Sequence, residues 1–103
     1  MNYTESEVVK MLKRHEGDGD FKSYKDGEGH LTVGYGHKVK DGDVDINGDP
    51  ITREDQIVSR QQADNWFAQD SKTAFRQAKS VYGFDRMSPN RQKAIIDLTY
   101  NMG

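Results

Sequence analysis

A glutamate, an aspartate and a threonine lie close together in residues 15–37, which read HEGDGDFKSYKDGEGHLTVGYGH. Glu16 and Asp26 stand on either side of a strand predicted at residues 21–25, and Thr32 follows Asp26 by six positions. Glycoside hydrolysis uses two carboxyl groups flanking the scissile bond and a water positioned for attack. Glu16, Asp26 and Thr32 are therefore the candidate catalytic residues for cleavage of a glycan.

Each of these residues has a chemical and a structural interpretation. Glu16 comes at the end of a predicted helix, where the macrodipole disfavours a negative charge, and this suits a general acid. Asp26 is expected to act as a base or as electrostatic support, but an aspartate that only caps a turn fits the same position. Thr32 is either a water-holding hydroxyl or an ordinary strand residue. Three further carboxylates of the stretch could substitute: Asp18, Asp20 and Glu28.

One helix and a small sheet must position the three candidates. Thr4 and Glu7 form a capping box that predicts a helix over residues 5–15. Short strands are expected at residues 21–25, 30–35 and 44–46, with a turn at residues 26–29. Gly34 and Gly36 bracket Tyr35, which predicts a bulge or a close backbone approach.

The remainder of the chain is predicted to be helical. Ser59 and Gln62 form a second capping box before a long helix over residues 60–79. The apolar stripe of that helix is Ala63, Trp66, Phe67, Ala74, Phe75 and Ala78. After an apolar loop at residues 82–84, Ser88-Pro89 begins a last helix. Its predicted buried face is Ala94, Ile95, Leu98 and Met102.

Composition excludes several classes of protein. The chain has 103 residues, which suffices for a single domain with a modest core. It has no cysteine, so disulfides and thiolate metal sites are excluded. Neither a membrane span nor a signal-peptide core is visible in the sequence. Its basic residues are spread singly, so no nucleic-acid partner is expected.

Two patterns raise the question of a metal. Residues 43–54, DVDINGDPITRE, match the calcium loop expression of EF-hands, so a calcium ion held between Asp43 and Glu54 is one interpretation. The other is an acidic, solvated loop with a turn at Asn47-Gly48. His15 and His37 lack partners at ligand spacing, which favours structural or surface histidines over metal ligands. No cofactor is required by the candidate chemistry.

The order of these motifs resembles the signature of phage-type lysozymes, the endolysins of glycoside hydrolase family 24. The resemblance is carried by HEG, YKDGEGHLTVGYGH and RQKAIIDLTYNMG, and it extends over nearly the whole chain. It implies an α+β, lysozyme-like fold in a single domain over residues 1–103. Residues 1–58 would form a helix-plus-hairpin lobe that carries the motif, and residues 59–103 a long linking helix and a partial helical lobe.

The resemblance also implies an activity. Family members cleave the β-1,4 bond between N-acetylmuramic acid and N-acetylglucosamine of bacterial peptidoglycan, and a phage uses this activity for host-cell lysis or for penetration of the wall. Their glutamate, aspartate and threonine correspond to Glu16, Asp26 and Thr32, and inversion is expected at a carboxylate separation of about 6.5–9.5 Å. Family members continue with helices after the NMG segment, so we expect a partner segment or chain to complete the cleft. The protein is expected to be made in the host cytoplasm and to act on the wall, or to be virion-associated.

Overall fold

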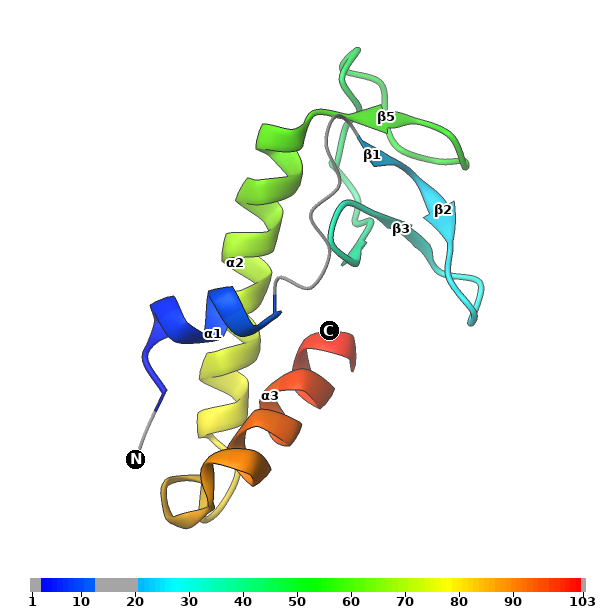
Figure 1. The fold of residues 1–103 in the computed structure, drawn as a ribbon. Helices are drawn as coiled ribbons and strands as arrows, with labels where there is room; N and C mark the ends of the chain where they lie inside the picture. Colours follow the sequence, from blue (N-terminus) through cyan, green and yellow to red (C-terminus); the bar gives the residue numbers. More distant parts are fainter. Residues whose placement is uncertain (1–2, 13–20, 103) are drawn as a thin grey trace. The chain divides into compact units, whose positions relative to one another are not determined.

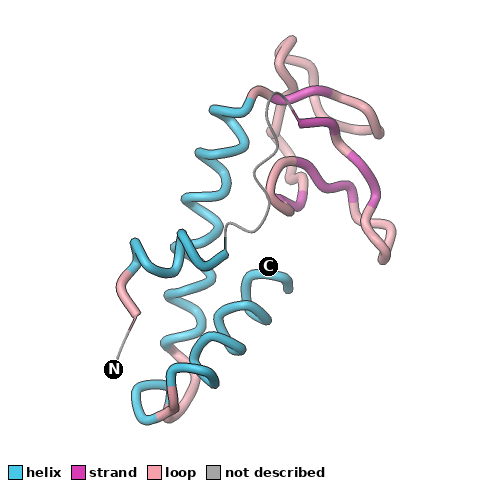
Figure 2. Tube along the Cα trace, viewed as in Figure 1, coloured by secondary structure: helices cyan, strands magenta, loops and turns pink. Residues whose placement is uncertain are grey.

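The computed structural model describes residues 3–12 and 21–102. Its elements are α1 (Glu5–Leu12), β1 (Phe21–Lys22), β2 (Tyr24–Lys25), β3 (Leu31–Val33), β4 (His37–Lys38), β5 (Ile57–Val58), α2 (Arg60–Lys79), the 3-10 helix η1 (Phe84–Arg86) and α3 (Pro89–Met102) (Figures 1 and 2). Helices and small antiparallel sheets confirm the predicted α+β class.

Two compact units divide the described residues. The helical unit contains residues 3–12 and 68–102, and the sheet unit contains residues 21–67. The long helix α2 contributes residues to both. This division differs from the expected halves, residues 1–58 and 59–103, because α1 groups with the later helices.

The helical unit begins with the predicted capping box. The Glu7 N–H donates to Thr4 Oγ1 at 3.2 Å, and the Thr4 N–H donates to Glu7 Oε1 at 2.9 Å. The backbone N–H of Thr4 is the main reason that the pKa of Glu7 is lowered. Val8 and Leu12 are the buried residues of α1. Residues 13–15 of the predicted helix lie outside the described part of the chain.

Helix α2 has the predicted bounds and buries the predicted stripe. All six apolar residues named for that stripe are at most 8% exposed. At its start the Gln62 N–H donates to Ser59 Oγ at 3.1 Å, as the second capping motif predicts. The stripe serves both units, because its first three members belong to the sheet unit and its last three to the helical unit.

Helix α3 buries a different face from the predicted one. Leu98 and Met102 are 59% and 71% exposed, whereas Gln92 and Ile96 are fully buried. The side-chain amide of Gln92 donates to the Phe84 carbonyl at 2.8 Å, which turns this polar position inward. The predicted face was wrong because apolar spacing alone cannot show that a glutamine has a buried carbonyl to bind.

The sheet unit contains two sheets, a β1–β5 pair and a three-stranded sheet in the order β2-β3-β4. The predicted strand at residues 21–25 is divided at Ser23. Ser23 Oγ donates to the Arg53 carbonyl at 2.7 Å and accepts the Gln56 N–H at 2.9 Å, so the chain changes pairing partner there. Residues 44–46 form only an isolated bridge between Val44 and Pro50, and the third strand is β4 instead.

The core of the sheet unit lies between the three-stranded sheet and the first half of α2. It consists of Val33, Ile51, Val58 and Trp66. Gly34 has φ +70°, and a Cβ there would lie 3.1 Å from Ala63 Cβ of α2. This confirms the close backbone approach predicted at Gly34, because a side chain there would crowd Ala63 and would strain the left-handed backbone.

Candidate active site

The hairpin of β2 and β3 places Asp26 and Thr32 on one face. Tyr24 lies opposite Thr32 and Lys25 opposite Leu31. The Asp26 N–H donates to the His30 carbonyl at 2.9 Å, which extends the pairing by one step. Because side chains alternate along a strand, Asp26 points to the same side as Tyr24 and Thr32. Such diagonal neighbours are separated by about 7–8 Å.

The turn of this hairpin depends on a glycine. The Gly29 N–H donates to the Asp26 carbonyl at 3.0 Å, and Gly29 has φ +83°. A tight turn followed by a left-handed glycine is a common three-residue hairpin connection. The connection brings the chain back so that Thr32 lies beside Tyr24 of β2.

The Asp26 carboxylate is held by its own turn. Its Oδ1 accepts the N–H groups of Glu28 and His30, each at 2.9 Å, and His30 Nδ1 lies 3.7 Å from its Oδ2. The His30 backbone N–H is the largest of the effects that lower the pKa of Asp26. The Glu28 N–H and the charges of His30 and Lys38 add to it and outweigh partial burial. The carboxylate is therefore ionised at neutral pH, and it is a weak proton acceptor.

Thr32 is 4% exposed at the centre of the three-stranded sheet. Its Oγ1 donates to the His30 carbonyl at 3.0 Å. A hydroxyl has one donor and two acceptor lone pairs, so the Thr32 oxygen can still accept a hydrogen bond from a water. The turn and the strand interpretations of Asp26 and Thr32 are thus compatible with their chemical roles.

Glu16 lies outside the described residues, as do Asp18, Asp20 and His15. The separation of the Glu16 and Asp26 carboxyl groups and the role of Glu16 stay predictions. Glu28, the remaining alternative carboxylate, has a side chain that is 80% exposed on the turn.

His37 lies in the interior of the sheet unit. The ring is 6% exposed and stacks on Trp66, with centroids 4.4 Å apart and planes 6° apart. Its Nε2 lies 2.8 Å from Asp43 Oδ2. The Asp43 pairing was not predicted, because β4 and the turn that joins these two residues were not expected.

The loop of residues 43–54 is held by hydrogen bonds from the protein itself. Asp45 Oδ1 accepts the N–H groups of Asn47 and Asp49, and its Oδ2 accepts the side-chain amide of Gln56 at 3.0 Å. The Gln56 amide is the largest cause of the lowered pKa of Asp45. Among residues 3–12 and 21–102, no three His, Asp or Glu side chains gather in a metal-binding group. Calcium binding stays a prediction.

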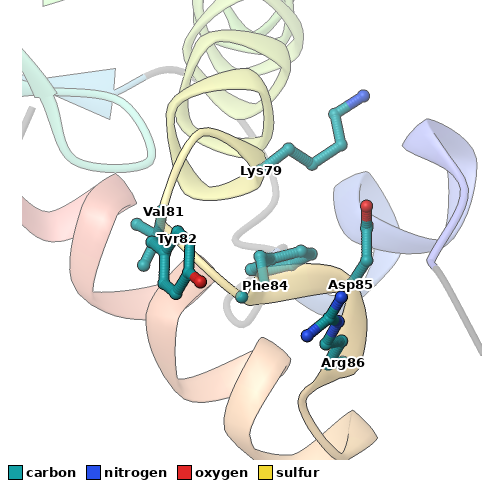
Figure 3. A pocket seen from close by; sticks show the side chains of 7 residues that line it. Lys79, Val81, Tyr82, Phe84, Asp85 and Arg86 are labelled. Carbon is teal, nitrogen blue, oxygen red and sulfur yellow. The ribbon is translucent and has the colours of Figure 1, made fainter.

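A separate pocket of about 260 Å³ lies in the helical unit, at the corner between α2 and α3 (Figure 3). Tyr82 at its rim is 97% exposed, whereas Phe84 is 2% exposed. The predicted apolar loop thus points one aromatic ring outward and the other inward. The described candidates Asp26 and Thr32 do not line this pocket.

Lys38 is a residue of the candidate site that the sequence did not predict. It lies on β4 opposite Thr32 and therefore on the same face as Asp26. The signal that could have revealed it is the alternation of His37, Lys38 and Val39, with a charged residue between two less polar ones. Because no strand was predicted at these residues, the alternation could not be assigned to a sheet.

Within the described residues, no helix is long and apolar enough to cross a membrane.

Comparison with known proteins identifies the family. A sequence profile described as Phage lysozyme matches residues 4–103. The chain is 32% identical over 93 residues to Peptidoglycan hydrolase gp36 of Enterobacteria phage SP6, an alignment that covers 82% of this chain and 9% of that protein. The chain thus spans less than a tenth of the length of this relative. No solved structure matches. The profile and the identity together show that the chain belongs to the phage lysozyme family.

Proposed function

We propose that the chain is a muramidase, a glycoside hydrolase that cleaves the β-1,4 bond between N-acetylmuramic acid and N-acetylglucosamine in peptidoglycan. Membership of the phage lysozyme family supports this proposal. So does the similarity to a phage protein named as a peptidoglycan hydrolase. The observation that carries it is that Asp26 and Thr32 share one face of the β2–β3 hairpin.

In the proposed mechanism, Glu16 protonates the departing glycosidic oxygen. Asp26 lies on the opposite face of the sugar, and Thr32 accepts a hydrogen bond from the attacking water. The lowered pKa of Asp26 favours electrostatic support of the oxocarbenium-like state over a strong base role. The water attacks C1 from the face opposite the leaving group and gives its proton to the Asp26 carboxylate as the new C–O bond forms, which inverts the anomeric configuration.

Activity on cell-wall material tests the proposal. Wild type should clear peptidoglycan in a gel and release reducing ends, whereas Glu16→Gln and Asp26→Asn should each lower the rate at least about hundredfold. Asp41→Asn is a matched control, because this exposed aspartate lies on another turn of the sheet unit. Equal clearing by wild type and Glu16→Gln would refute the assignment of the acid.

The stereochemical prediction has its own measurement. NMR of the first-formed anomer should show the α-configured product from a β-linked glycan. A β product would show retention and would require the two carboxyl groups to lie about 5 Å apart.

A second function is supported by the exposed apolar residues of α3. In this alternative, the chain binds glycan or serves in a virion without turnover, and another segment or chain must cover Leu98 and its neighbours before a cleft is complete. Leu98 and Met102, four positions apart on α3, are 59% and 71% exposed, and neighbouring exposed apolar side chains favour such a partner. Glycan binding without release of reducing ends would support this alternative over the first.

For the place of action, we propose synthesis in the host cytoplasm and action on the bacterial wall, or association with the virion. We also propose that catalysis requires no cofactor. Rates measured with a calcium chelator and with added calcium test the latter. Unchanged rates and an unchanged melting temperature would also refute the calcium interpretation of residues 43–54.

A further inference from the structure

The outer face of the three-stranded sheet carries a row of three side chains. Tyr24 of β2 lies opposite Thr32 of β3, and Thr32 lies opposite Lys38 of β4. Side chains that are directly opposite in antiparallel strands have Cβ atoms about 4.5–5.5 Å apart. The row therefore crosses the whole sheet, with the short threonine between an aromatic and a cationic side chain.

The two ends of this row present different chemistry to solvent. The Tyr24 side chain is 45% exposed, so part of its ring is uncovered. Lys38 is half-buried and lies on the same face as Asp26. Its charge is the smallest of the effects that lower the pKa of Asp26.

An anionic glycan matches this arrangement. The face of a tyrosine ring is electronegative and attracts the polarised C–H groups on the flat side of a sugar. A lysine ammonium binds carboxylates as a compact point charge. Thr32 is buried between these two side chains, so a sugar ring on the exposed part of Tyr24 would direct its substituents across the sheet toward Lys38.

We propose that the row of Tyr24, Thr32 and Lys38 is a glycan subsite that selects a carboxylate-bearing sugar, with Lys38 binding the carboxylate. In a muramic acid residue, that carboxylate is carried by the 3-O-lactyl group. The inference rests on the proposed muramidase function and adds to it a residue that determines specificity.

The simplest competing interpretation is that Lys38 is a surface lysine that only stabilises ionised Asp26. In that case, substitution of Lys38 would change the turnover number, and its decline toward acidic pH, equally on all glycans. A specificity residue would instead change KM, and only for the glycan that carries the carboxylate.

The experiment compares two forms of one polymer. Peptide-free glycan chains expose lactyl carboxylates, and amidation with carbodiimide and methylamine neutralises them without changing the sugar backbone. We expect wild type to have a KM about tenfold lower for the free-carboxylate chains, because a hydrogen bond from an ammonium to a carboxylate is stronger than one to a neutral amide. The turnover number should differ less than about twofold between the two polymers.

Three variants locate the effect. Lys38→Met should lose the preference, with a KM on both polymers near that of wild type on the amidated one, and Lys38→Arg should retain it. Lys25→Met is the matched control, because this exposed lysine lies on the adjacent position of β2, which faces the other side. Melting temperatures would verify folding. A Lys38→Met variant that keeps the wild-type ratio of KM values overturns the inference.

Failure of the muramidase proposal gives a different result. Wild type would then cleave neither polymer, and calorimetric titration with the same two polymers tests the subsite by binding alone. A Kd at least about fivefold lower for the free-carboxylate chains, and its loss in Lys38→Met, supports the inference. Equal Kd values for the two polymers overturn it.

Discussion

The two faces of the three-stranded sheet differ in what they do. On the inner face, Val33 and His37 pack with Trp66 in the core. On the outer face, Thr32 and Lys38 accompany the ionised Asp26. Because successive residues alternate between faces, neighbouring positions on the same short strand separate into those that stabilise the unit and those proposed to act on substrate. Substitutions on the inner face should therefore lower mainly the free energy of unfolding, and substitutions on the outer face should lower mainly activity.

The largest expected effect is on the inner face. Trp66→Ala should lower the free energy of unfolding by about 3–5 kcal/mol, because it removes a side chain that contacts the core and the His37 ring. Urea denaturation measures the change, and Trp66→Phe is the control that keeps a ring. A loss below about 1 kcal/mol would contradict the assignment of this residue to the core.

A smaller effect is expected for the histidine on the same face. His37→Ala should cost about 2–3 kcal/mol, because it removes a stacked ring and leaves the Asp43 carboxylate without the imidazole 2.8 Å away. A double-mutant cycle with Asp43→Ala measures the coupling between the two side chains. Additive losses would mean that the pair contributes only through packing.

On the outer face, activity should change more than stability. Thr32→Val keeps the shape of the buried side chain and removes its hydroxyl, so we expect turnover to fall about tenfold, equal to about 1.4 kcal/mol. The free energy of unfolding should change by less than about 1 kcal/mol. Thr32→Ser should retain most of the activity. A Thr32→Val variant with the turnover number of wild type would contradict the proposed water-holding role.

The smallest effect is expected from protonation of Asp26. Its pKa is lowered in the folded protein, so the stabilisation is present above the ordinary aspartate pKa of about 3.9 and is lost as pH falls through the lower folded value. Denaturation at several values between about pH 2 and 5 should show wild type losing stability toward acid more steeply than Asp26→Asn. Equal slopes would indicate that the turn hydrogen bonds to Asp26 do not persist in solution.

Local signals explain which elements were predicted well. The Thr4–Glu7 capping box and the apolar stripe of α2 depend on contacts within a few residues or along one helix face, and both are present in the structure. The divided strand at Ser23 depends instead on hydrogen bonds to Arg53 and Gln56, about thirty positions away. No local pattern indicates such a partner.

The candidate site shows the same limit. The sequence placed Asp26 in a turn and Thr32 on the following strand, and the hairpin confirms both positions. It could not show that Lys38 joins them, because this requires β4 to return beside β3. The buried face of α3 was predicted wrongly for a related reason, because the Phe84 carbonyl that accepts the Gln92 amide belongs to the preceding 3-10 helix.

By itself, the sequence determined the α+β class, the helix starts, the turn glycines and the family to which the chain belongs. These depend on backbone preferences, on side-chain periodicity and on residue order, all of which are local properties. Only the tertiary structure decided which face of α3 is buried, where the third strand lies and that Tyr24, Thr32 and Lys38 form one row. Each of these depends on partners distant in the chain, whose contacts form only when the backbone is folded.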